Sequence, residues 1–161
     1  MNHQDPIFTI TSSYYLNEMQ SVISGRIDKL ISIALFILGG SVMASFSNMF
    51  IIGAFISALS AIQIFCQFGK QSDASNDRAK QYLALMHDAP KLTEEEIHQK
   101  LGNLLQSDVF AFGALYNPAH KRAAIHLGLT DDTKLTKFES VMAWLAGDLP
   151  RDTPSDDTPH I

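Results

Sequence analysis

Between Leu30 and Gly69 the chain runs for forty residues without a single Asp, Glu, Lys or Arg. As one straight helix this run would be about 60 Å long, roughly twice the thickness of the hydrocarbon core of a bilayer. It must therefore fold back on itself, and Ser47-Asn48 is the polar interruption near its middle. We expect a transmembrane hairpin over residues 30–69, with spans at 30–46 and 49–68. A buried hairpin in a soluble protein is the alternative, but such helices usually carry a charged face.

The basic residues near this run indicate its orientation. Two precede it, and three follow it, while the expected turn has none: Arg26, Lys29, Lys70, Arg78 and Lys80. Cytoplasmic flanks of membrane spans are enriched in Lys and Arg. We therefore expect both termini in the cytoplasm and the Ser47-Asn48 turn outside.

The rest of the chain predicts an all-α protein, since no segment alternates as a strand does. Residues 1–29 predict a loose lead-in followed, from about Ser13, by an amphipathic helix. That helix could lie on the membrane or pack on the chain's own helices; its polar face is not rich in Lys or Arg, which favours packing. Residues 70–149 predict a cytoplasmic helical region, and residues 150–161, with three prolines and three aspartates, a disordered tail.

Local signals divide the region after residue 69 into helices. The run from Lys70 to Arg78 is polar and predicts either a loop or a continuation of the second span. Thr93-Glu94-Glu95-Glu96 has the spacing of a capping box. Asn117-Pro118 indicates a further helix start, and Gly128 and Gly147 indicate helix ends.

We find no constellation typical of an enzyme, and we expect neither catalytic activity nor a cofactor. The six histidines are scattered, and no two have the spacing of a zinc motif. The one cysteine, Cys66, lies in the second expected span, which excludes a Cys/His zinc site. The net charge of −5 argues against nucleic acid as a partner, because phosphate binding needs a basic face.

The most informative pattern is a polar stripe on the second expected span. Its members fall at about 0°, 40°, 340°, 280° and 320° on a helical wheel of 100° per residue: Gly53, Ser57, Ser60, Gln63 and Gln67. The small residues would allow close helix packing, with the glutamines bonding across the interface. Alternatively, several copies would turn this stripe towards a shared, water-filled path. An oligomer can use both arrangements.

This layout resembles the SLATT-type two-transmembrane effector domains of bacterial conflict systems. The resemblance covers about residues 13–128 and depends on the hairpin and on the helix that follows it, with Ala79-Lys80-Gln81-Tyr82-Leu83. It implies a pore-forming effector of antiviral defence that works beside a nucleotide-sensing partner. No sensor domain is fused to the hairpin in this sequence, so sensing would fall to a separate protein or to the small tail.

Two hypotheses follow for the function. In the first, the chain is a non-enzymatic protein of the bacterial inner membrane that forms homo-oligomers and permeabilises the lipid bilayer as a defence effector. In the second, the hairpin is an inert anchor, and residues 79–147 recruit a cytoplasmic partner protein. The two hypotheses differ in whether the assembled protein leaks ions or dye.

Overall fold

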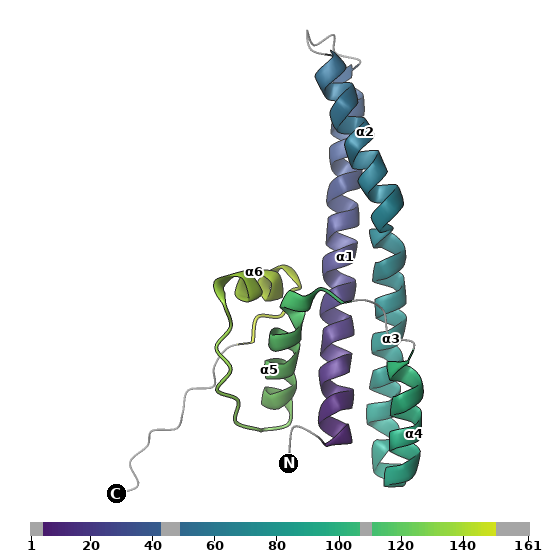
Figure 1. Ribbon diagram of the computed structural model, residues 1–161, viewed down its shortest axis with the longest axis vertical. Coiled ribbons are helices and arrows are strands. Elements are labelled where there is room, and N and C mark those ends of the chain that lie inside the picture. The colour runs from purple at the N-terminus through teal and green to yellow at the C-terminus, as the bar shows by residue number, and fades with distance from the viewer. Residues whose placement is uncertain (1–4, 43–48, 107–110, 151–161) are drawn as a thin grey trace, which may run out of the picture.

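The computed structural model of the chain describes residues 5–42, 49–106 and 111–150 (Figure 1). Within these ranges the protein is all-α and has no strand, as the sequence predicted. The α-helices are α1 (Pro6–Val42), α2 (Met49–Cys66), α3 (Phe68–Asp88), α4 (Glu94–Leu105), α5 (Tyr116–His126) and α6 (Lys137–Leu145). Two short 3-10 helices, Ala89–Lys91 and Gly113–Leu115, precede α4 and α5.

Helix α1 is continuous over 37 residues and is therefore about 55 Å long. It begins at Pro6, and the Asp5 carboxylate accepts a hydrogen bond from the Ile7 amide at 3.0 Å. Aspartate before a proline at the first helical position is a strong start signal. The expected lead-in up to residue 11, with a helix from about Ser13, is therefore wrong.

Residues 6–29 of α1 form the centre of a helical body that also contains α3, α4, α5 and α6 (Figure 1). On one side, α1 packs against α3 and α4 through a first cluster: Ile10, Tyr82, Leu85, Ala89, Ile97 and Leu101. On the other side it packs against α5 and α6 through a second cluster: Met19, Ile23, Leu115, Ala119 and Ala146. The apolar face of residues 6–29 is thus covered by the chain's own helices rather than left for lipid.

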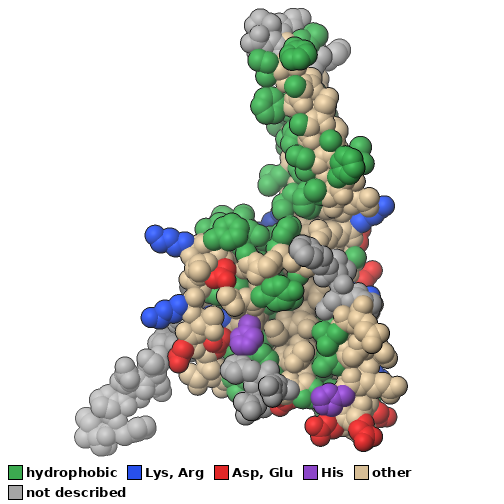
Figure 2. Space-filling model, in the orientation of Figure 1, with side chains coloured by type: hydrophobic (Ala, Val, Ile, Leu, Met, Phe, Trp, Pro, Cys, Tyr) green, Lys and Arg blue, Asp and Glu red, His purple; other side chains and the backbone are tan. Residues whose placement is uncertain are grey.

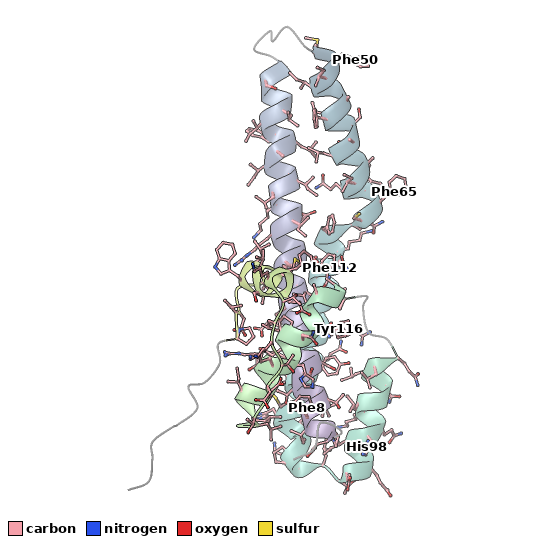
Figure 3. All side chains as sticks on the ribbon, turned by 60° about the vertical axis from the view of Figure 1, so that its left-hand side comes forward. Phe8, Phe50, Phe65, His98, Phe112 and Tyr116 are labelled. Carbon is pink, nitrogen blue, oxygen red and sulfur yellow. The ribbon has the colours of Figure 1, made fainter. Side chains whose placement is uncertain are left out.

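Beyond Leu30, α1 leaves the body and runs antiparallel to α2 (Figure 1). We call residues 30–42 and α2 the apolar arm. Many of its large side chains face outwards, with Phe36, Phe50 and Phe65 each more than 80% exposed. Figure 3 shows Phe50 and Phe65 directed away from α1, and Figure 2 shows hydrophobic side chains along the whole projection. Such a surface is far more apolar than that of a water-soluble protein.

One helix of the described residues is long and apolar enough to cross a membrane, the run from Met49 to Lys91 in which α3 continues α2. Helix α1 does not meet the same criterion, because its charge-free part within the described residues is short, from Leu30 to Val42. The second span is therefore supported by length and composition. The first span, and the orientation of the pair, remain predictions.

The polar run at 70–78, for which the sequence predicted either a loop or a continuation of the second span, is helical throughout and belongs to α3. The capping box at Thr93 is confirmed, with the Glu96 amide bonded to Thr93 Oγ1 and the Thr93 amide bonded to Glu96 Oε2. Gly128 and Gly147 have positive φ and end α5 and α6, as predicted. Residues 151–161, where we predicted disorder, lie outside the described residues.

The start of α5 differs from the prediction. The helix begins at Tyr116 rather than after an Asn117 cap, and no side chain caps it. Asn117 Nδ2 instead donates to Glu139 Oε1 of α6 at 2.6 Å. The Asn117 side chain, which the local pattern assigned to capping α5, is therefore used in a tertiary contact with Glu139.

Candidate functional site: the polar stripe of α2

The predicted stripe does not face one environment. Ser60 and Gln63 are half-buried on the side of α2 that packs against α1, whereas Gly53 and Ser57 are exposed. Gln63 Nε2 donates a hydrogen bond to Ser32 Oγ of α1 at 3.1 Å. One edge of the stripe thus serves packing within the chain. The other edge is left open.

Gln67 lies at the point where α2 becomes α3, in the left-handed region with φ 46° and ψ 45°. The backbone bonds on both sides of it are kept: its amide donates to Gln63 O at 3.1 Å, and its carbonyl accepts from the Gln71 amide at 3.0 Å. Because its backbone departs from α-helical geometry, the side chain does not continue the stripe at the angle predicted for a regular helix. The structure therefore does not bring Gln67 into register with Gln63.

The open edge of the stripe consists of small residues that do not pack against any other helix that the structure describes. A Cβ added at Gly53 would meet no atom within 4 Å, and Ser57 and Ala61, four and eight residues later, are exposed. The same is true of Gly39 and Gly40 on α1, where an added Cβ would also meet nothing within 4 Å. We call Gly53, Ser57 and Ala61 the small-residue edge. It does not contribute to close packing inside the arm.

Close packing occurs lower down, where the arm joins the body. Ser72 Oγ of α3 donates a hydrogen bond to Ser21 O of α1 at 2.8 Å. A Cβ added at Gly25 of α1 would lie 2.9 Å from Ser72 Oγ. One turn further, a Cβ added at Gly69 would lie 3.4 Å from the Asp28 carboxylate. The two helices are thus held together tightly just below the charge-free arm.

A second polar region, which sequence reasoning missed, is a cleft of about 470 Å³ between α1, α5 and α6. Two of its charged groups form an ion pair, with Arg122 Nε 2.9 Å from Asp148 Oδ2, and Arg26 Nη1 donates to the backbone oxygen of Leu145. Tyr15 OH lies 2.8 Å from His126 Nδ1. Burial raises the pKa of Tyr15, against the opposing effect of Arg122. These contacts join α1 to α5 and to the C-terminal end of α6.

Two further histidines of the described residues, His98 and His120, make similar local contacts. His120 Nδ1 lies 3.4 Å from Asp131 Oδ2, and its ring packs edge-on against Phe8 at 4.7 Å between centroids. His98 lies 4.0 Å from Glu94 one turn earlier in α4. Among the residues that the structure describes, no three His, Cys, Asp or Glu side chains are grouped closely enough to hold a metal ion.

Comparison with known proteins adds no assignment. No protein-family model, no curated protein and no solved structure matches the chain. Any function must therefore be argued from the arm, its small-residue edge and the body below it.

Proposed function

We propose that this chain is a non-enzymatic, two-pass protein of the bacterial inner membrane that self-associates through the small-residue edge of α2 and permeabilises the bilayer. On this proposal the arm spans the membrane, both termini lie in the cytoplasm, and the protein is a defence effector of the SLATT type. A cytoplasmic sensor protein would supply the trigger.

The observation that carries the proposal is the exposure of Gly53, Ser57 and Ala61 on an arm with no charged side chain. In hydrocarbon there is no hydrophobic drive for helices to associate, so interfaces depend on close backbone approach over small residues. Within the chain, α1 contacts the neighbouring face of α2 and leaves this edge free. A second copy is the natural partner for it.

Permeabilisation is supported by the hydroxyl group at this edge. Ser57, which is exposed, brings a hydroxyl group into the part of the arm that would lie in hydrocarbon, where an unpaired polar group is costly. In an oligomer, the Ser57 hydroxyls can bond across the interface or face a shared, hydrated path. Both arrangements need several copies, so assembly and leakage are coupled.

The test compares Gly53→Leu with Ala58→Leu, an exposed position about 140° away from Gly53 on the same helix. The new side chain at position 53 starts in open space, so the hairpin itself should fold unchanged. We expect Gly53→Leu to weaken self-association about tenfold or more, which is about 1.4 kcal/mol, and to reduce dye leakage from proteoliposomes. Ala58→Leu should leave both properties unchanged. Oligomers that persist in Gly53→Leu would place the interface elsewhere.

The alternative is an anchor that recruits a cytoplasmic partner through residues 79–147. It is favoured by a groove of about 310 Å³ between α3 and α4, lined in part by Ala84, Leu85 and Leu104. An anchor of this kind leaks nothing in any assembly state. Wild-type proteoliposomes that hold dye and ions at every protein density, while the protein is oligomeric, would favour the anchor over the pore.

A further inference from the structure

Helix α6 has a buried face and an exposed apolar face. Ala143 and Ala146 are buried in the body, and Met142 packs against the second cluster. The opposite face exposes four large side chains within an arc of about 120°: Phe138, Val141, Trp144 and Leu145. Phe138 and Trp144 are each 66% exposed. Large apolar side chains gathered in this way indicate an interaction surface.

The position of α6 along α1 indicates what this face meets. Arg26 of α1 donates to the Leu145 carbonyl at the end of α6, and it lies four residues, about 6 Å of helix, before Leu30, where the charge-free run begins. Figure 1 shows α6 beside α1, with its axis turned across that of α1 rather than parallel to it, at the end of the body nearest the arm. Figure 2 shows hydrophobic side chains on the side of α6 that faces the arm.

The residue types at this level fit a membrane surface. Tryptophan is enriched at the boundary between headgroups and acyl chains because its ring is apolar and its N–H is polar. Lys137 is exposed at the start of α6, Lys134 is exposed three residues before it, and Lys29 and Lys70 are exposed on α1 and α3 at the base of the arm. Lysines at this depth are attracted to anionic headgroups. The apolar face of α6, with Trp144, therefore lies near the base of the arm, which Lys29 and Lys70 flank.

We propose that α6 lies in the interfacial layer of the membrane, on the surface through which the arm enters. The exposed face of α6 inserts among the headgroups and upper acyl chains, and the rest of the body lies on the aqueous side. This face consists of Phe138, Val141, Trp144 and Leu145. The proposal rests on the arm spanning the bilayer. A membrane that begins at Leu30 brings its headgroups to α6 without any rearrangement, which favours lipid over a protein partner as the occupant of this face.

The chain has a single tryptophan, so Trp144 fluorescence reports on α6 directly. The full-length protein is reconstituted in phosphatidylcholine and phosphatidylglycerol vesicles whose phosphatidylcholine carries bromine near either the headgroup end or the methyl end of the acyl chains. We expect strong quenching by bromine at the headgroup end and weaker quenching at the methyl end. We also expect Trp144 to be several-fold less sensitive to aqueous acrylamide than a water-exposed tryptophan.

Two variants in a Trp144→Phe background calibrate the measurement. Phe55→Trp places the tryptophan on the exposed face of α2, and Leu83→Trp places it on α3, far below the arm; both positions are exposed. Brominated lipid should quench the first, and acrylamide the second. If acrylamide quenches Trp144 as strongly as it quenches the tryptophan of Leu83→Trp, the proposal is overturned. It is also overturned if neither quencher reaches Trp144, because a protein surface then covers it. Failure of Phe55→Trp to respond to brominated lipid instead refutes the membrane placement of the arm itself.

Discussion

The contact between Gly25 of α1 and Ser72 of α3 offers a sensitive test of the packing that joins the arm to the body. A Cβ added at Gly25 would lie 2.9 Å from Ser72 Oγ but 3.7 Å from Ser72 Cβ. The first distance is a clash, and the second is ordinary van der Waals contact. Ser72 Oγ can turn away only by giving up its 2.8 Å hydrogen bond to Ser21 O. Gly25→Ala is therefore opposed by the hydroxyl alone.

The expected magnitude follows from three terms. Overpacking by a methyl group costs about 1–3 kcal/mol, and we take about 2 kcal/mol here, which includes about 1 kcal/mol for the hydrogen bond that Ser72 loses when its hydroxyl turns away. Alanine returns about 1 kcal/mol through its greater helix propensity. Gly25→Ala alone should thus lower the free energy of unfolding by about 1 kcal/mol. In a Ser72→Ala background the clash is gone, and the same change should raise that free energy by about 1 kcal/mol.

The assay is a double-mutant cycle in mixed micelles, with unfolding by SDS followed by far-ultraviolet circular dichroism. The predicted coupling between the two positions is about 2 kcal/mol, well above the error of such a cycle. The decisive result is the change of sign between the two backgrounds. Stabilisation by Gly25→Ala in both backgrounds would refute the close approach of α1 and α3 at this level.

Three further predictions concern the arm and its junction with α3. Gln67→Gly should raise the free energy of unfolding by about 0.5–1 kcal/mol, because glycine tolerates the positive φ that glutamine adopts here; Gln67→Ala should bring no gain in the same SDS titration. In a Cys66→Ala background, Met49→Cys should react with a membrane-impermeant maleimide on intact cells and Asp77→Cys only after lysis, and reaction of Asp77→Cys from outside would invert the topology. Gln63→Leu should lose the bond to Ser32, cost about 1 kcal/mol in unfolding and lower dye leakage if the stripe is hydrated, whereas unchanged unfolding would deny that bond.

Sequence reasoning found the helix signals that involve only near neighbours. The Thr93 box needs Glu96 three residues later, and both ends of the interaction are visible in the sequence. The same pattern at Thr136 and Glu139 caps α6, so this signal could have been found by the same rule. Asn117 misled because its partner, Glu139, is 22 residues away and belongs to another helix. Local patterns do not reveal such competition.

The stripe on α2 was predicted only as a set of positions. A helical wheel gives the angle of each side chain but not the face that α1 will cover. That face depends on how α1 and α2 are aligned, and the structure shows this alignment in the hydrogen bond between Gln63 and Ser32. The wheel also assumes regular geometry up to Gln67, and the left-handed backbone there breaks it. Which part of the stripe stays open is therefore a property of the fold.

The capping box of α6 makes a last prediction, on acid. Hydrogen bonds from the Thr136 amide at 2.7 Å, from Thr136 Oγ1 at 2.8 Å and from Asn117 Nδ2 at 2.6 Å hold the pKa of Glu139 below its ordinary value of 4.5. A carboxylate whose pKa is lowered on folding stabilises the fold above its unfolded pKa, and this is lost as the pH falls through the folded pKa.

The cap of α6 should therefore be intact at neutral pH and weaken only below pH 4.5. We expect the Thr136 amide resonance to titrate together with the Glu139 carboxyl in NMR spectra of the protein in micelles. Glu139→Gln keeps an acceptor oxygen but removes the charge, so it should abolish the acid titration of the Thr136 amide. The Thr93 amide, bonded to Glu96 in the matching box of α4, is the internal control and should still titrate in that variant. A Thr136 amide that titrates above pH 4.5, or that still titrates in Glu139→Gln, would show that this carboxylate does not hold the first turn of α6.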